Sequence, residues 1–498
     1  MKPTNEVQES LKRFSKDSLT YGIAVIIPAI LGVLSISIYT RTFSANEYGI
    51  YNMVLMTTTF ITTLFAQWIQ QSVQRFLPEY RNNISIFNAN LMALLFSILL
   101  VILLLAFILC PLKSIMGSYQ GYYGISVMLV STQFLYLTIS TVAQSSFKSI
   151  AYKNISLING LFKFIFPILL IYVVDRTINN LLLGIVLSQL LLIYPLMRIS
   201  SFRIKDLILI NFKNFTKFVY SIFSYGFPMI GWFLGNSVLN LCDRYVIQIF
   251  SSSKEVGIYS ANYSIVFSTL SLLTSPLILA AQPILMNQSN IKENKEKIKK
   301  TISSFSTFFV IISMPMLSYV ICFQHEISAF FLGGVYSEGS KVIPLLFGGI
   351  FLWNLALFGH KGFELLKETK IMFLFVLFCA FLNIILNLLL VPRFGYIGSS
   401  VATLISMGIY PLLVLIVSKR TILEWQLDWK SIYKIAVSSG VAGIFAIILK
   451  LFPFNGHYFI ELFIGGLIGL FIYFYMIIKL KVVDVDIQEY INKFKFKQ

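Results

Sequence analysis

The sequence predicts an all-α polytopic membrane protein with about 14 transmembrane helices, and three observations support this class. Hydrophobic residues make up 57% of the 498 residues and charged residues only 12%, whereas a soluble domain has about 25% charged residues. The apolar residues gather in runs of roughly 20, which is enough to cross a ~30 Å hydrocarbon core as a helix. A transmembrane β-barrel would instead show alternating segments of about 10 residues.

The predicted spans follow one another with short connections. They cover residues 19–40, 48–73, 89–110, 121–146, 155–175, 179–198, 219–241, 257–284, 302–323, 342–361, 371–391, 396–418, 432–451 and 458–479. The first run is longer than the apolar core of a usual signal peptide, and no clear small-residue cleavage site closes it. We therefore expect it to remain as the first span.

The distribution of basic residues orients these spans. If the N-terminus lies in the cytoplasm, 30 of the 39 Lys and Arg residues fall in cytoplasmic segments, eight fall in outer segments, and Lys163 lies inside a span. Cytoplasmic loops are enriched in Lys and Arg, and one missed span would invert every later loop. We therefore expect both termini in the cytoplasm, and we interpret the net charge of +18 as a topology signal rather than a nucleic-acid site.

A short motif occurs twice and divides the chain. Glu-x-Gly-Ile-Tyr begins at Glu47 and again at Glu255, an offset of 208 residues, each time before an apolar run. Six predicted spans separate the copies, so the two copies have the same orientation, as in parallel-repeat membrane proteins. The sequence thus predicts two six-helix lobes in parallel repeat plus two C-terminal helices.

Four segments follow from this repeat. They are an N-lobe at 1–198 with spans 1–6, a cytoplasmic linker at 199–218, a C-lobe at 219–418 with spans 7–12, and spans 13–14 with a basic cytoplasmic tail at 419–498. The linker is basic and half apolar, so we expect an amphipathic helix on the membrane surface.

Polar side chains form a ridge in corresponding spans of the two lobes. Their spacings of three and four residues place each set on one helix face. The ridges contain Thr59, Thr63, Gln67, Gln70, Gln71 and Gln74 in the first lobe, and Ser264, Ser268, Ser271, Thr274, Ser275 and Gln282 in the second. Such residues either join packed helices by hydrogen bonds or line a water-filled cavity. The matched pair favours a shared cavity, to which Asn236 and Asn240 would contribute.

Charged residues within or beside the spans need an explanation. Lys163 lies about eight residues into its span, where a charge costs about 2.5–3.5 kcal/mol and usually faces a cavity or a partner. We therefore expect a functional role for Lys163, the alternative being a snorkelled or paired structural lysine. Asp243 and Arg244, near the outer end of their span, form either an interfacial pair or the outer wall of the cavity.

Two cytoplasmic span ends are candidates for gating or coupling. The segment QRFLPEYR after the second span is either a basic helix stop or a gate in which Glu79 pairs with a basic loop of the other half. The tenth span ends in HKGFE, where His360 is either structural or, because His titrates near neutral pH, a proton-coupling group. The candidates for a gate or coupling role are Glu79, Arg81, Asp243, His360, Lys361 and Glu364.

Catalytic and metal-binding signatures are missing from the sequence. There is no Walker-type glycine loop, nucleophile elbow or zinc motif, and the three histidines and four cysteines are widely spaced. We therefore expect no enzyme activity, no metal site and no resident cofactor. H+ coupling, Na+ coupling and the membrane potential stay open as driving forces.

Three segments, in their order and spacing, resemble a known family. They are QRFLPEYR after span 2, DRYVIQIFSSSKEVGIYSANYSI between spans 7 and 8, and RFGYIGSSVATLIS leading into span 12. Together with the two six-helix lobes and two added helices, they resemble the O-antigen and capsule repeat-unit flippases (Wzx type). This family belongs to the multidrug/oligosaccharidyl-lipid/polysaccharide (MOP) exporter superfamily. The likeness covers nearly the whole chain.

The resemblance implies a MATE/MOP-like transporter of the bacterial cytoplasmic (inner) membrane. Such proteins move an undecaprenyl-diphosphate-linked oligosaccharide from the cytoplasmic to the outer leaflet by alternating access, with the repeated motif fixing equivalent turns in the two lobes. The partners implied are this lipid, the bilayer, a polysaccharide polymerase and a chain-length regulator, and no nucleic acid. Polar ridges would meet sugar hydroxyls, and cavity cations would meet the diphosphate. The cations are Lys163, Arg41, Arg75 and Arg244.

Three other functions remain as alternatives. A cation-coupled MATE-type multidrug exporter requires an acidic residue buried in a span, and Asp243 and Glu461 lie near span ends. A membrane glycosyltransferase or polymerase requires large outer loops with acidic groups, and the predicted outer loops are short. A lipid II flippase belongs to the same class as the favoured function.

Overall fold

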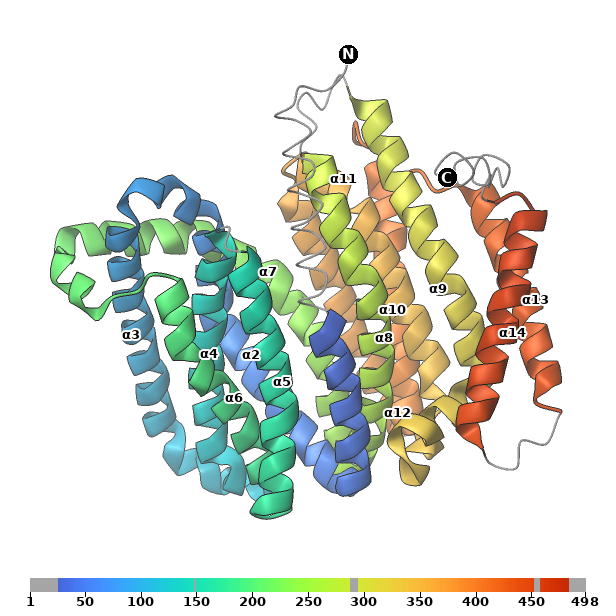
Figure 1. Ribbon diagram of the computed structural model, residues 1–498, viewed down its shortest axis with the longest axis horizontal. Coiled ribbons are helices and arrows are strands. Elements are labelled where there is room, and N and C mark those ends of the chain that lie inside the picture. The colour runs from blue at the N-terminus through green and yellow to red at the C-terminus, as the bar shows by residue number, and fades with distance from the viewer. Residues whose placement is uncertain (1–25, 147–148, 287–293, 452–456, 483–498) are drawn as a thin grey trace, which may run out of the picture. The chain divides into compact units, whose positions relative to one another are not determined.

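Helices make up nearly all of the computed structural model (Figure 1), which describes residues 26–146, 149–286, 294–451 and 457–482. No strand occurs among these residues. The long helices are Ile26–Thr42, α2 Ala45–Phe76, α3 Ile84–Leu109, α4 Tyr123–Ser145, α5 Ser149–Val173, α6 Ile178–Ile199, α7 Phe212–Phe250, α8 Ser253–Met286, α9 Lys295–Leu332, α10 Val342–Gly359, α12 Thr369–Ser418, α13 Trp429–Leu449 and α14 Tyr458–Lys479. The short ones are α11 Lys361–Leu365 and the 3₁₀ helices η1 Leu77–Asn83, η2 Cys110–Tyr122, η3 Ile204–Leu209 and η4 Gly334–Gly339.

The number of candidate spans agrees with the prediction of about 14. Within the described residues, 11 helices are long and apolar enough to cross a membrane, or 12 if α7 counts as one span despite its 51° bend. A shorter apolar helix, Ile26–Thr42, precedes them. The predicted class, an all-α polytopic membrane protein, is therefore confirmed.

The long helix α12 accounts for two of the predicted spans. It breaks at Gly395, whose φ of 56° is a backbone conformation that glycine adopts without steric cost. Asn387 accepts a hydrogen bond from Ser399 (2.7 Å) and Asn383 donates one to Ser406 (3.2 Å). These bonds join residues on both sides of the break, so the two arms of α12 lie antiparallel, as expected for spans 371–391 and 396–418.

The chain separates into two units by its internal contacts. The first unit contains Met1–Ser268 and Thr369–Ser406, and the second contains Thr269–Glu368 and Met407–Gln498. Helices α8 and α12 each continue from one unit into the other. The predicted lobes at 1–198 and 219–418 stay a prediction.

The predicted linker at 199–218 is not one continuous helix. It contains η3 and the first turn of α7, joined by an extended residue, Ile210. Ile208 and Phe212 are 87% and 82% exposed, so the segment presents large apolar side chains outward. That exposure is compatible with a membrane-surface location, which stays a prediction.

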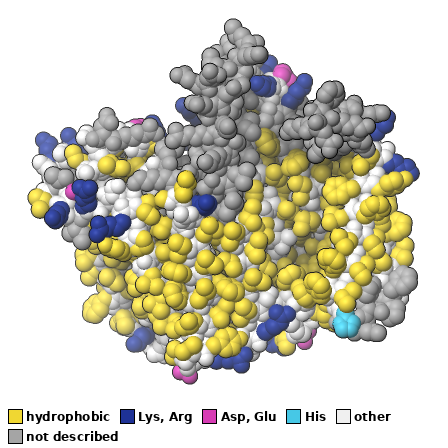
Figure 2. Space-filling view, in the orientation of Figure 1, with side chains coloured by type: hydrophobic (Ala, Val, Ile, Leu, Met, Phe, Trp, Pro, Cys, Tyr) yellow, Lys and Arg dark blue, Asp and Glu magenta, His cyan; other side chains and the backbone are white. Residues whose placement is uncertain are grey.

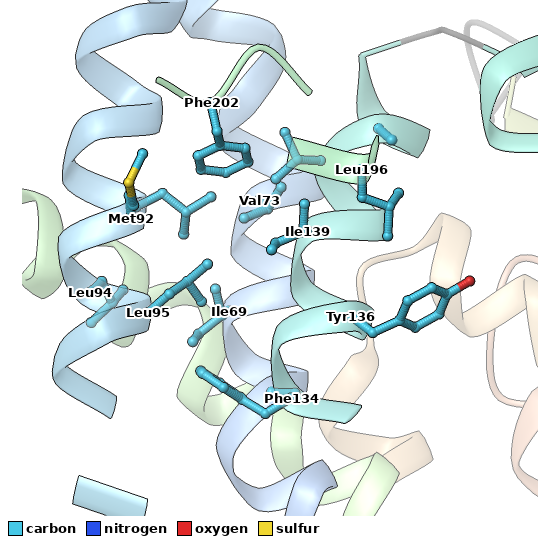
Figure 3. Close-up of a cluster of buried hydrophobic side chains, with 14 of the residues drawn as sticks. Ile69, Val73, Met92, Leu94, Leu95, Phe134, Tyr136, Ile139, Leu196 and Phe202 are labelled. Carbon is cyan, nitrogen blue, oxygen red and sulfur yellow. The ribbon is translucent and has the colours of Figure 1, made fainter. Parts of the chain in front are cut away.

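Hydrophobic side chains form the core of the first unit, where α2 to α6 run alongside one another (Figure 1). Ala66, Ile69 and Val73 lie on one face of α2 at spacings of three and four residues, Leu77 follows at the start of η1, and all four are buried. Figure 3 shows side chains from α3, α4 and α6 converging on this face. Because lipid tails are as apolar as these side chains, close packing rather than water exclusion stabilises such an interface in the membrane.

The outward sides of the helices are apolar. Figure 2 shows hydrophobic side chains over their long sides, with most Lys and Arg side chains toward their ends. Phe107 on α3 and Phe471 on α14 are 78% and 76% exposed. Exposed phenylalanines at this density would favour aggregation in water, so these faces are suited to hydrocarbon.

In the second unit, α9 contacts α10, α13 and α14. Trp425, in the connection between α12 and α13, donates its Nε1–H to Ser306 Oγ at 3.0 Å and packs against Gly359. Lys450 Nζ pairs with the Glu326 carboxylate at 2.8 Å. These contacts join the ends of α10, α12 and α13 to α9.

The repeated motif begins two helices. In the first copy, Ser44 Oγ accepts from the Glu47 backbone N–H (3.3 Å), and the Glu47 carboxylate accepts from the Ser44 N–H (2.9 Å). This reciprocal arrangement is a capping box. In the second copy, Ser252 Oγ accepts from the Glu255 N–H (3.3 Å). The glutamates of the motif therefore mark the N-termini of α2 and α8.

The glycines of the two copies pack against each other's backbone. A Cβ atom on Gly49 would lie 1.8 Å from the carbonyl oxygen of Ser253, and one on Gly257 would lie 1.9 Å from that of Ala45. Ala45 and Ser253 are related by the same offset of 208 residues as the glycines. The contact is therefore a local pseudo-two-fold crossing of α2 and α8, and only glycine fits at its centre.

We predict that Gly49→Ala and Gly257→Ala each destabilise the protein. Each added methyl group would overlap a backbone oxygen that cannot rotate away, so the cost should reach at least the ~1–3 kcal/mol of an overpacked core. Thermal unfolding of the purified protein in detergent measures the change.

Gly440→Ala is the matched control, because a Cβ on this α13 glycine would meet nothing within 4 Å. It should be neutral or slightly stabilising, since alanine reduces the entropy of the unfolded chain. If all three variants unfold at the same temperature, the crossing does not depend on glycine.

Candidate functional site

A polar cavity of about 560 Å³ lies in the first unit. Its wall is formed by the helix Ile26–Thr42 and by α2, α4, α5, α6, α7 and α8. The polar lining consists of Ser35, Tyr39, Tyr48, Tyr51, Asn52, Thr59, Gln133, Asn236, Ser237, Asn240, Tyr263, Ser264 and Ser268. The described lining also contains two cations, Lys163 and Arg244, and no Asp or Glu. The two cations therefore favour a negatively charged occupant.

Close helix packing positions Lys163 on α5. A Cβ on Gly160 would lie 2.9 Å from Pro28, and one on Gly184 of α6 would lie 2.4 Å from the backbone of Pro167. These contacts hold α5 against its neighbours on both sides of Lys163. Lys163 lines the cavity, and among the residues that the structure describes it takes part in no ion pair.

Side chains from α7 and α8 fix Arg244. Its Nε donates to Ser260 Oγ at 3.1 Å, and its Nη1 donates to the backbone oxygen of Asn240. The guanidinium carbon lies 4.6 Å from the ring centroid of Tyr263 and 5.8 Å from that of Tyr259, which is cation–π distance. Arg244 thus lines the cavity in one orientation although its side chain is only 1% exposed.

The neighbouring carboxylate, Asp243, points away from this cavity. Its Oδ2 accepts from Tyr259 (2.5 Å) and Thr403 (2.7 Å), and its Oδ1 accepts from Asn387 (2.8 Å). The residue is 0% exposed and is not part of the lining. The two sequence-derived alternatives, an interfacial pair and an outer cavity wall, both place Asp243 incorrectly. It lies inside the protein against α12, where three donors offset the cost of burying its charge.

The structure brings together two of the four cations predicted to bind the diphosphate and separates the other two from them. Lys163 and Arg244 share the cavity, whereas Arg41 and Arg75 lie outside its lining and are exposed. Arg75 instead pairs with Glu79 at 2.6 Å. The predicted partner of Glu79, a basic loop of the other half, is thus replaced by an arginine one turn earlier.

Part of the predicted polar lining faces the cavity. Asn236, Asn240 and Ser268 contribute to it. Five ridge residues of α2 lie beyond the lining, namely Thr63, Gln67, Gln70, Gln71 and Gln74. Ser271 and Ser275 belong to the second unit, and the side chains of Gln282 and Arg81 lie outside the described residues.

His360, Lys361 and Glu364 form a buried network in the second unit. Glu364 pairs with His360 Nε2 at 3.1 Å and with Lys361 Nζ at 2.8 Å, and His360 Nδ1 lies 3.0 Å from the hydroxyl of Tyr410. Every polar atom in this chain of contacts has a protein partner. The network therefore supports the junction of α10, α11 and α12, and a coupling role stays a prediction.

Sequence reasoning missed several residues of the site. Tyr39, Tyr48 and Gln133 line the cavity, and Asn387 and Thr403 hold Asp243. Asn383 and Asn387 recur at i, i+4 in an otherwise apolar span, as do Ser399 and Thr403 in the next one. That pattern is the same polar-face signal that revealed the ridges, so it was available in the sequence.

Many apolar helices around a polar, cationic cavity define a class, the multi-helix membrane transport proteins. The model of the polysaccharide biosynthesis protein family matches residues 14–289, more than half of the chain, and the chain belongs to this family. The MatE model matches residues 228–389. An uncharacterized membrane protein of Methanocaldococcus jannaschii is 21% identical to the chain over 98% of each sequence.

Solved structures share the fold. The lipid II flippase MurJ, in an inward closed conformation, has a TM-score of 0.75 and 17% identity, covering 92% of this chain and 98% of that one. An inward-facing multidrug resistance MATE family transporter of the MOP superfamily has a TM-score of 0.59 and 11% identity, covering 80% and 97%. At these identities the likeness concerns the fold alone, and it confirms the predicted MATE/MOP-like architecture.

We predict that Asp243→Ala destabilises the protein strongly. The change removes three hydrogen bonds, and although Asn387 and Thr403 keep a backbone acceptor, the buried Tyr259 hydroxyl loses the carboxylate, so the total cost should be about 2–3 kcal/mol. Thr403→Val removes one donor and leaves the carboxylate two others, so its cost should be near 1 kcal/mol.

Thermal unfolding in detergent compares these variants. Asp175→Ala, at an exposed aspartate after α5, controls for the loss of a negative charge and should change little. If Asp243→Ala is no worse than Asp175→Ala, the network does not hold the carboxylate as described.

Proposed function

We propose that the protein is a flippase. Its cargo would be an undecaprenyl-diphosphate-linked oligosaccharide repeat unit, moved from the cytoplasmic to the outer leaflet by alternating access during O-antigen or capsule biosynthesis. The cavity is the observation that carries this proposal, because its described lining joins two cations to a polar wall without an acid. Membership of the polysaccharide biosynthesis protein family supports the same cargo class.

The chemistry of the cavity suits this cargo. A diphosphate and sugars cannot cross hydrocarbon unaided, since each unsatisfied polar group costs several kcal/mol there. Lys163 and Arg244 would supply charge-assisted hydrogen bonds to phosphate oxygens. Amide and hydroxyl groups from α2, α7 and α8 would bind sugar hydroxyls in place of water, and the tyrosine rings offer flat apolar faces beside them.

The direction of transport can come from the membrane potential. Moving two negative charges outward, with the inside negative, gains roughly 4.6 kcal/mol per 100 mV, twice the ~2.3 kcal/mol for one charge. Coupling to H+ or Na+ through Asp243 or His360 would add to this bias. Location in the bacterial inner membrane with cytoplasmic termini, and cooperation with a polymerase and a chain-length regulator, belong to the same proposal.

The cavity lining favours an anionic cargo, and it leaves the lipid II flippase open. The cation-coupled exporter also stays open, because Asp243 is an acid buried within α7. A cationic drug requires an acidic group in the cavity, and the described lining holds none. Lipid II shares the polyprenyl diphosphate, so the cations suit both flippases equally. Transport assays that differ only in the sugar of the cargo separate these two functions.

We predict that Lys163→Ala impairs polysaccharide export while the protein remains in the membrane. Loss of a charge-assisted contact worth about 1.5–3 kcal/mol should lower transport by roughly 10- to 100-fold. Lys163→Arg keeps the charge and should impair transport less. Surface polysaccharide, normalised to the amount of protein in the membrane, measures the effect.

Arg75→Ala is the matched control, since Arg75 is exposed and paired with Glu79 outside the cavity. It should display polysaccharide at nearly the normal level. If Lys163→Ala displays the normal amount of surface polysaccharide at normal expression, Lys163 does not bind the diphosphate as proposed. Saturable binding of a radiolabelled lipophilic cation to the purified protein would instead favour the drug exporter.

A further inference from the structure

A second cavity, of about 530 Å³, lies on another side of α2 in the first unit. We infer that it holds an acyl chain of a bilayer phospholipid. Its wall comes from α2, α3, η2, α4 and α7. Its lining is mostly aliphatic and aromatic, with Met53, Val54, Ile61, Phe65, Ile102, Leu105, Leu109, Val127 and Val130 among the residues. This volume and composition are those of a site for an apolar ligand.

Polar side chains of this wall bond to one another and to backbone oxygens. Thr57 Oγ1 lies 2.7 Å from the Tyr245 hydroxyl, Tyr119 donates to Gln248 Oε1 at 3.0 Å, and Tyr123 donates to the backbone oxygen of Ala106 at 2.5 Å. A buried water needs two to four polar partners, and most of this lining is aliphatic or aromatic carbon. An alkyl chain needs none.

The surroundings of the cavity point to the source of that chain. Helix α3 is the most apolar of the candidate spans, and its lining residues Leu105 and Leu109 are 42% and 48% exposed. The outer side of this wall therefore faces hydrocarbon, where phospholipid chains are the most abundant molecules. Lys113 follows Leu109 by one turn of chain and is exposed, so a cation is available near the helix end for a lipid phosphate.

A chain in this site would support the walls of the polar cavity. On α7, Tyr245 lines the apolar site while Arg244 lines the polar cavity. On α2, Thr57 lines the apolar site while Met56 lines the polar cavity. Helix α4 likewise contributes Gln133 to the polar cavity and Val130 to the apolar site, so the two sites share three helices of their walls. The bound chain would therefore fill the space behind them, whatever cargo the polar cavity carries.

Native mass spectrometry of the full-length protein, taken from the membrane in mild detergent, tests the inference. Wild type should keep one phospholipid through delipidation that removes the rest. Ala106→Trp fills the cavity from α3 and should lower this occupancy roughly tenfold. Phe107→Trp, at the neighbouring position that is 78% exposed, is the matched control and should keep the lipid.

A measurement on the unmodified chain guards against misfolding of Ala106→Trp. Wild-type protein in vesicles of phosphatidylglycerol with a photoreactive acyl chain should be labelled at Tyr123 and Val127, which line the cavity. Labelling confined to outward residues such as Phe107 would overturn the inference. So would full phospholipid retention by a folded Ala106→Trp variant, or retention of a polyprenyl phosphate alone.

Discussion

The backbone contact between Gly49 and Gly257 is the constraint on which the first unit depends. It sets the crossing of α2 and α8 at the point where both helices begin, and both helices then line the polar cavity. A capping box at Ser44 and Glu47 fixes the start of α2, and the Ser252 cap fixes the start of α8, so the crossing sets how the first turns of both helices are placed. A side chain at the crossing would separate the helices and change the cavity wall along its length.

Helix α2 shows how one span can serve three environments. Its buried aliphatic stripe, which includes Ile69 and Val73, packs into the core with α3, α4 and α6. A second stripe with Asn52 and Thr59 faces the polar cavity, and a third with Val54 faces the apolar site. These stripes constrain several faces of the helix at once. This explains why α2 reads as only weakly amphipathic although each of its faces is specialised.

The sequence was sufficient for the fold class, whereas of the four cations it offered for one cavity, Lys163 and Arg244 lie in the lining and Arg41 and Arg75 do not. Apolar runs of span length predicted the helices, and a lysine within a span predicted a special environment for Lys163. The position of the glutamines in the later turns of α2, outside the cavity lining, was not predictable in this way. Gln67 and Gln71 have the same helical spacing as true lining residues, and only tertiary packing decides which turns of a helix face a cavity. The predicted position of Asp243 was wrong for the same reason. Its distance from the span end does not reveal that α12 packs against it.

Three consecutive residues of α7 connect the parts of the site. Successive side chains on a helix point about 100° apart, so Asp243, Arg244 and Tyr245 reach the α12 network, the polar cavity and the apolar site respectively. Tyr259 joins the first two, because its hydroxyl donates to Asp243 while its ring lies against the Arg244 guanidinium. A change of charge at Asp243 would alter the hydroxyl bond that orients this ring, and the ring is one of the groups that hold Arg244 in place. Any coupling between the buried carboxylate and an anion in the cavity would thus need only one side chain as its intermediary.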